Sequence, residues 1–207
     1  MKKVLNYLLC CVLYLSFFSI NINANEFIID HQANGRKVSY EEIINKISDI
    51  NECSLDEAEE FLVLSHLKNN NERTYQQALN QVRALSYWED RIYVNSYNYS
   101  YPAKLFVYYS YAGTTSQRHI QEIIIINIET NNGSQMKQFG GTVQINLQGD
   151  QRYYYYVYGS LYNNGTTTTG VTVNIGIDEV ASVNFNCSTT TSYYDYIIRS
   201  GYRYGYR

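Results

Sequence analysis

The pattern of hydrophobic and polar positions changes its period once along the chain, near residue 90. Before that point apolar residues recur every three to four positions, which is typical of amphipathic helices. After it they alternate with polar residues, which is typical of strands that have one dry face and one wet face. The pattern predicts an α+β protein, in which a small N-terminal three-helix unit is followed by an antiparallel β-sandwich of about eight strands.

Three helix starts are marked by a Ser or Thr with a Glu or Gln three residues later, the spacing of a capping box. The three pairs are Ser39 with Glu42, Ser54 with Glu57, and Thr74 with Gln77. The predicted helices cover residues 40–48, 55–68 and 75–88. Each has one apolar stripe, and Trp88 extends the stripe of the third, so the three helices are expected to pack against one another.

The second half reads as a series of strands and turns. The stretch TVQINLQ (142–148) alternates strictly, and EIIIINIE (122–129) is apolar on both faces, which predicts a central strand. The Asn-Gly pairs at 132–133 and 164–165 predict hairpin turns, because type I′ turns need positive φ. The predicted strands are 92–100, 104–111, 119–129, 138–147, 152–161, 168–177, 181–188 and 193–204.

The first 24 residues have the pattern of a secretory signal peptide. Lys2 and Lys3 precede an apolar run over 4–20, and Ala24 offers a small residue at the cleavage site. The alternative is a membrane anchor, but the run falls short of the roughly 20 residues that a span needs. We therefore expect a secreted or cell-surface protein with no membrane span after cleavage. The expected organisation is a signal peptide (1–24), a helical unit (25–90) and a Tyr-rich β-sandwich (91–207).

Export bears on the two cysteines that remain after cleavage. An oxidising compartment makes a disulfide between Cys53 and Cys187 possible. Two separate buried thiols are the alternative. If the two residues pair, they join the helical unit to the sheet.

Charge argues against a nucleic-acid partner. Residues 25–90 hold 13 acidic and 6 basic residues, and the second predicted helix begins with Asp56, Glu57, Glu59 and Glu60. A helix that approaches phosphates would be repelled by these carboxylates. The helix-turn-helix rhythm of this region is therefore interpreted as an ordinary amphipathic hairpin.

Tyrosine dominates the later part of the chain, since 20 of the 24 tyrosines lie after residue 86. In RYYYYVYGSLY (152–162) parity places Tyr154, Tyr156 and Tyr158 on the wet face. The dry face is expected to carry Tyr153, Tyr155, Val157 and Leu161. Tyrosine offers a large contact area at low entropy cost and keeps a hydroxyl for hydrogen bonding. The candidate binding residues are Tyr154, Tyr156, Tyr158, Arg199, Tyr202, Arg203 and Tyr204. The alternative is that these tyrosines simply favour strand formation.

Residues that usually carry catalysis are sparse. His31, His66 and His119 show no paired metal-ligand spacing, and no metal or other cofactor is predicted. Cys53 and His66 are close in sequence, yet nothing marks a positioned base. Asp178–Glu179 is expected in a turn, with weak calcium binding as an alternative.

These observations predict a non-catalytic binding protein that recognises a glycan or another envelope component through a Tyr-rich sheet. The first alternative is a secreted protein–protein interaction module, such as an effector or toxin subunit. The second is a hydrolase with a carboxylate pair that the sequence does not reveal. Tyrosines that line a groove would favour a glycan, and a flat tyrosine patch would favour a protein. Carboxylates that face each other at about 5–10 Å would favour the hydrolase.

Overall fold

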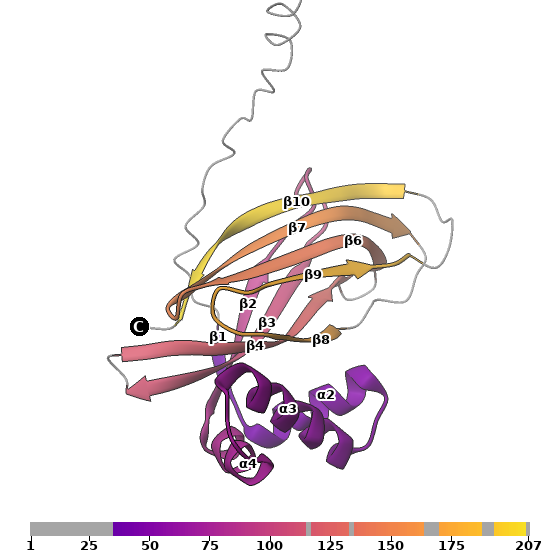
Figure 1. The fold of residues 1–207 in the computed structure, drawn as a ribbon. Helices are drawn as coiled ribbons and strands as arrows, with labels where there is room; N and C mark the ends of the chain where they lie inside the picture. The colour runs from indigo at the N-terminus through magenta and orange to yellow at the C-terminus, as the bar shows by residue number, and fades with distance from the viewer. Residues whose placement is uncertain (1–34, 115–116, 133–134, 164–169, 188–192, 206–207) are drawn as a thin grey trace, which may run out of the picture.

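The computed structural model describes residues 35–114, 117–132, 135–163, 170–187 and 193–205. The predicted signal peptide lies outside these residues. The described chain forms three helices and ten strands (Figure 1). In order they are β1 (Gly35–Val38), α2 (Tyr40–Asn51), α3 (Leu55–Asn70), α4 (Tyr75–Ala84), β2 (Ser86–Tyr93), β3 (Lys104–Thr114), β4 (Gln117–Glu129), β5 (Asn131–Asn132), β6 (Gln135–Gln148), β7 (Arg152–Asn163), β8 (Gly170–Ile175), β9 (Val180–Phe185) and β10 (Tyr193–Tyr204).

The three predicted helix starts are confirmed. The hydroxyls of Ser39, Ser54 and Thr74 each accept a hydrogen bond from the backbone N–H three residues later. Of these three described caps, only the one at Ser54 also has the return hydrogen bond, in which the side chain of Glu57 accepts from the backbone N–H of Ser54. None of the described helices is long and apolar enough to cross a membrane.

In helix α3, Ala58 and Leu62 of the apolar stripe are buried in the helical cluster, but the stripe departs from expectation at its ends. Leu55 and Leu64 are 53% and 48% exposed, whereas His66 is fully buried. His66, which the apolar spacing of the helix does not include, therefore faces the protein interior. The reason lies outside the helix, because the His66 ring meets the carboxylate of Glu122 on β4.

The strands form two antiparallel sheets, so the predicted α+β class is confirmed. The first sheet has the order β1–β2–β3–β4–β8. In the second, β10, β7, β6 and β9 are hydrogen-bonded in that order, and the two-residue β5 also pairs with β6. Residues from both sheets form one apolar cluster that includes Val107, Ile126 and Val157.

The helices cover the outer face of the first sheet (Figure 1). Ile43, Leu62 and Val82 from the helices form a second apolar cluster with Phe106 of β3 and Ile124 of β4. Strand β4 therefore contributes to both clusters, which explains its apolar character on both faces and confirms it as a central strand.

The strand predicted at 92–100 is wrong. The third helix ends at Ala84, and β2 begins two residues later, so Trp88 is in a strand. The predicted boundary near residue 90 falls inside β2. Pairing of β1 with β2 brings residues that precede the helices into the first sheet. The division into two domains stays a prediction.

The two Asn-Gly pairs have different surroundings. Asn132 pairs with Gln135 across the short β5–β6 hairpin, as expected. The pair at 164–165 lies outside the described residues. The strands on either side of it belong to different sheets, because β7 pairs with β6 and β10 whereas β8 pairs with β4. The second hairpin prediction is therefore wrong.

No disulfide joins Cys53 to Cys187, although the structure describes both residues. Cys53 follows α2 and packs with the helical cluster. Cys187 follows β9 in the second sheet, and its thiol donates to Gln138 Oε1 at 3.1 Å. The two thiols belong to opposite outer layers of the fold, which explains why the proposed pairing is wrong.

Candidate functional site

The outward side of the second sheet carries a group of tyrosines that we call the tyrosine face. Its members are Tyr154, Tyr156 and Tyr158 on β7 and Tyr196, Tyr202 and Tyr204 on β10. Tyr158 and Tyr204 are 54% and 52% exposed. The alternation of β7 confirms the predicted parity, since Tyr153 and Tyr155 are buried. No described helix or strand covers this face, and the helices lie on the far side of the first sheet (Figure 1).

The rings of the tyrosine face contact one another across and along the strands. Tyr154 and Tyr202 are register partners, and their ring centroids are 5.2 Å apart. Arg152 places its guanidinium 4.8 Å above the Tyr202 ring. The rings of Tyr156 and Tyr158 are parallel, with centroids 6.4 Å apart. Mutual contact fixes the orientation of these side chains before any partner arrives, which lowers the entropy cost of binding.

A strip of amide and hydroxyl side chains lies beside the tyrosines. On β6, Thr142, Gln144 and Asn146 are the register partners of Tyr158, Tyr156 and Tyr154. On β9 the strip continues with Ser182 and Asn184. Thr142 Oγ1 donates to Asn184 Oδ1 at 2.8 Å. The outward side of the sheet therefore combines aromatic surface with hydrogen-bonding groups.

Two predicted binding residues lie elsewhere. Arg203 is 5% exposed and points into the fold, where its Nη2 donates to the carbonyl of Arg91 at 3.3 Å. Burial raises the pKa of the neighbouring Asp90, and the charge of Arg203 partly opposes that rise. Arg203 is therefore removed from the candidate face. Arg199 lies on the edge strand β10 with its guanidinium 4.8 Å above the ring of Tyr99.

The loop between β2 and β3 extends the aromatic surface beyond β10. The Tyr97 ring stacks on Tyr196 with centroids 4.6 Å apart, and Tyr97 N donates to Tyr196 O at 2.7 Å. Tyr99 is 67% exposed and adopts φ +53°, which is unusual for an aromatic residue. Both residues fall within the strand predicted at 92–100, and neither is among the predicted binding residues. The signal that could have found them is the repeated tyrosine in YVNSYNYSY.

Asp195 of β10 holds this loop in place. Its buried carboxylate accepts from Tyr196 N at 2.9 Å and, at 3.3 Å each, from Asn98 N, Asn98 Nδ2 and Ser100 Oγ. Burial opposes ionisation of Asp195, but the hydrogen bonds outweigh it and lower the pKa of Asp195 below its usual value. An acceptor-only anion that gathers four donors fixes the loop and its two exposed tyrosines.

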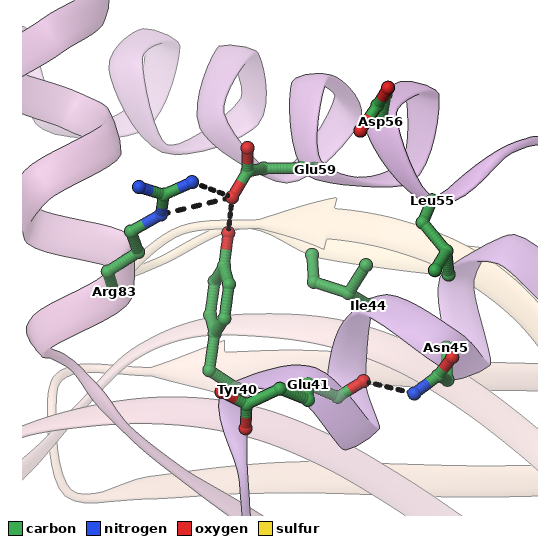
Figure 2. Close-up of a pocket in the computed structure, with 8 residues that line it drawn as sticks. All are labelled: Tyr40, Glu41, Ile44, Asn45, Leu55, Asp56, Glu59 and Arg83. Carbon is green, nitrogen blue, oxygen red and sulfur yellow. Dashed lines mark hydrogen bonds and ion pairs between the residues drawn. The ribbon is translucent and has the colours of Figure 1, made fainter.

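The structure also has a pocket of about 260 Å³ among the helices, which we call the helical pocket (Figure 2). In it Glu59 Oε1 accepts from Tyr40 OH at 2.5 Å and from Arg83 Nη2 at 2.6 Å. These bonds lower the pKa of Glu59, with the Tyr40 bond as the main cause. They join α2, α3 and α4, so we interpret this network as structural.

A second pocket of about 300 Å³ lies at the seam where α3, β4 and two turns meet. We call it the seam pocket. Its polar lining residues are Asn69, Asn70, His119, Gln121, Asp150 and Glu179. Neither pocket is lined by a residue of the tyrosine face.

The residues considered for catalysis are engaged in other contacts. His66 Nδ1 lies 2.7 Å from Glu122 Oε1, and His66 Nε2 lies 2.9 Å from Gln81 Oε1, so neither nitrogen is oriented toward Cys53. Among the described residues, no group of three His, Cys, Asp or Glu side chains could hold a metal ion. The carboxylates of Asp178 and Glu179 accept backbone N–H groups within turns.

Comparison with known proteins adds no assignment. No protein-family model matches the chain, no curated protein matches it, and no solved structure matches it. A function for this chain is therefore argued from its own geometry.

Proposed function

We propose that this is a secreted or cell-surface, non-catalytic binding protein whose tyrosine face docks a partner protein. The single observation that supports this most is the open outward side of the second sheet, where preoriented tyrosines lie beside amide and hydroxyl groups. Tyrosine, asparagine and serine are the residue types that recognition surfaces use, because they combine contact area with adaptable hydrogen bonding.

The size of this surface suits a protein partner. Strands about 4.8 Å apart and about ten residues long at about 3.3 Å per residue give four strands an area of roughly 500 Å². A standard interface buries about 800 Å² on each partner. The sheet alone supplies more than half of that value, and the Tyr97–Tyr99 loop adjoins it.

The face lies apart from both described pockets and includes exposed aliphatic residues. Ile198 and Val180, which flank the tyrosines, are 39% and 50% exposed. Aliphatic side chains between aromatic ones are typical of the centre of a protein interface. Arg152 is the only charged residue at the outward positions of these described strands. We therefore expect the binding to depend weakly on salt.

A glycan is the second candidate. The observation that favours it is the register pairing of Tyr154 with Asn146 and of Tyr156 with Gln144. A sugar ring could place its C–H groups on the phenol ring and bond its hydroxyls to the neighbouring amide. The position of both described pockets away from the tyrosine face makes the glycan the weaker of the two candidates.

The test is site-specific photo-cross-linking on the cells that produce the protein. A photoreactive residue replaces Ser200, which is exposed at the centre of the tyrosine face. The matched control position is Glu60, which is exposed on α3 away from the sheet. We expect one protein to cross-link from position 200, in about 0.5 M salt as well as in physiological salt, and not from position 60.

A glycan array probed with the same protein separates the two candidates. Equal cross-linking from both positions would contradict the proposal. Array binding that is lost on the combined change Tyr154→Ser and Tyr202→Ser, with no protein cross-linked from position 200, would replace the protein partner with a glycan.

A further inference from the structure

The seam pocket is built from segments that are far apart in the sequence. Asn69 and Asn70 come from the last turn of α3, and His119 and Gln121 from the start of β4. Asp150 belongs to the β6–β7 turn and Glu179 to the β8–β9 turn. The lining therefore comes from all three layers, the helices, the first sheet and the second sheet. The pocket forms only when the complete fold has formed.

In both asparagines the side-chain nitrogen is already hydrogen-bonded, whereas the side-chain oxygen is not. Asn69 Nδ2 donates to Asn174 Oδ1 at 2.8 Å. Asn70 Nδ2 donates to Glu122 Oε1 at 2.6 Å and to the carbonyl of His66 at 3.1 Å. No described residue donates to either side-chain oxygen. Because an amide nitrogen can only donate and an amide oxygen can only accept, the oxygens remain for a ligand.

Three further side chains of the seam pocket, Asp150, Glu179 and Gln121, also offer acceptor atoms, beside the donors of His119 and of the Gln121 amide. Asp150 is about half exposed, and its Oδ2 lies 2.6 Å from His119 Nδ1 without a well-aligned hydrogen bond. Glu179 Oε2 accepts from Gly176 N at 2.8 Å, which leaves Oε1. The Oε1 atom of Gln121 is buried and has no hydrogen-bond partner among the described residues. A donor that reaches this atom would satisfy it.

The local charge favours a cation. Two carboxylates face the seam pocket, and the C-terminal end of α3 adds the negative end of its dipole. The neighbouring Glu122 is already paired with His66. His119 already lies against the Asp150 carboxylate, so a neutral polyol would leave the Glu179 carboxylate uncompensated. A bare metal ion would find no group of three His, Cys, Asp or Glu ligands among the described residues. A volume of about 300 Å³ suits an organic group.

From these observations we propose that the seam pocket binds a protonated primary amine, held by the carboxylates of Asp150 and Glu179 and by the amide oxygens of Asn69 and Asn70. An ammonium group has three donors and no acceptor, which complements the acceptor atoms of Asn69, Asn70, Glu179 and Gln121. The site is separate from the tyrosine face and does not depend on the function proposed for that face.

Isothermal titration of the mature protein with matched probes tests the ligand class. Glucosamine and cadaverine supply the ammonium group on a sugar and on an alkyl chain. Glucose and N-acetylglucosamine are the corresponding uncharged probes. We expect saturable binding of at least one ammonium probe and none of the uncharged pair. Binding of glucosamine alone identifies an amino sugar, and binding of cadaverine alone identifies an alkyl amine.

Two conservative variants test the assigned residues. Asp150→Asn and Glu179→Gln each remove a charge and keep the shape, and each is expected to weaken ammonium binding about tenfold, as loss of a charged hydrogen bond does. The matched control is Asp56→Asn, which makes the same change in the helical pocket and leaves the affinity unaltered. The proposal is overturned by unchanged affinity in both seam variants, by equal binding of glucose and glucosamine, or by calcium binding without ammonium binding.

Discussion

His66 and Glu122 form a buried contact between α3 and β4, and each side chain is 1% exposed. Both ring nitrogens of His66 face oxygen atoms, on Glu122 and on Gln81, and Gln81 Nε2 in turn donates to Glu72. Two oxygen partners favour the doubly protonated ring. Burial opposes that charge, but the hydrogen bonds and the Glu122 carboxylate outweigh it and raise the pKa of His66 above 6.5.

This contact predicts that stability falls as the pH rises above 6.5. A histidine whose pKa is raised by folding stabilises the protein fully below its unfolded pKa. That contribution is lost as the pH rises through the folded pKa, with a slope of at most about 1.4 kcal/mol per pH unit. Urea unfolding of the double variant His66→Gln, Glu122→Gln between pH 6 and pH 9 should lack this slope. The control His119→Gln should keep it, and equal slopes in all three proteins would contradict the assignment.

Asp195 gives a second prediction at the scale of one residue. Because Asp195→Asn replaces an acceptor with a donor among four donors, we expect a loss of about 1.5–3 kcal/mol and faster hydrogen exchange at Asn98 and Tyr99. Asp178→Asn is the control, since Asp178 accepts from Gly149 N alone among described residues. Unchanged stability and exchange in Asp195→Asn would show that the carboxylate does not hold the loop.

Buried polar residues are also where the sequence analysis failed. Glu89 and Asp90 follow the predicted third helix at the expected boundary, yet both are buried in β2 on opposite faces of the first sheet. Glu89 accepts from Tyr108 OH at 2.8 Å, and Asp90 from Tyr153 OH at 2.7 Å. Their partners lie 19 and 63 residues away. A local pattern contains no information about such distant hydrogen bonds.

At the scale of elements, helix starts and alternating strands could be predicted because their signals are local. The N-caps at Ser39, Ser54 and Thr74 and the alternation of β7 are such signals. The end of α4 is not, because Leu85 and Trp88 keep a three-residue spacing while the chain already enters β2. Tertiary packing determines the conformation at Trp88, because its side chain packs with the apolar cluster between the sheets.

Strands β6 and β7 approach closely at a pair of glycines. Gly141 and Gly159 are register partners, and the ring of Phe139 covers them. A Cβ at Gly159 would lie 2.6 Å from Gly140 O and 2.6 Å from Phe139 Cε2. The backbone oxygen is unable to move aside without disturbing the ladder.

Gly159→Ala is therefore expected to destabilise the protein by about 1–3 kcal/mol. The control is Gly176→Ala, because the nearest atom to its Cβ would be 3.7 Å away and the cost should stay within about 0.5 kcal/mol. Chemical denaturation of both variants checks the difference. Equal stability of the two variants would mean that the sheet relaxes around the added methyl group.

At the scale of the whole molecule, the helices and the tyrosine face lie on opposite sides of the first sheet (Figure 1). The pairing of layers is not encoded in any one segment, so neither the docking of the helices nor the seam pocket could be predicted from the sequence. The tyrosine face could be, because parity alone separates outward from inward positions along one strand. Arg203 was misplaced because parity was not applied to β10, where Arg203 stands between Tyr202 and Tyr204 and so points to the opposite side of the sheet.

This arrangement predicts that the outward tyrosines contribute little to the core. The combined change Tyr154→Ser, Tyr156→Ser, Tyr158→Ser should cost about 2 kcal/mol, chiefly through loss of the Tyr154–Tyr202 contact. For a chain of this size that lowers the melting temperature by about 4–8 °C. Tyr153→Ser, at a fully buried position, should cost about 3–5 kcal/mol by itself.

The measurement that tests the central claim most directly is photo-cross-linking from position 200 in the folded triple variant. If the tyrosine face is the binding surface, the variant keeps its cooperative melting transition and loses the partner that cross-links to the wild-type protein. A folded variant that cross-links to the same partner with undiminished yield would contradict the claim, and the tyrosines would then be strand-forming surface alone.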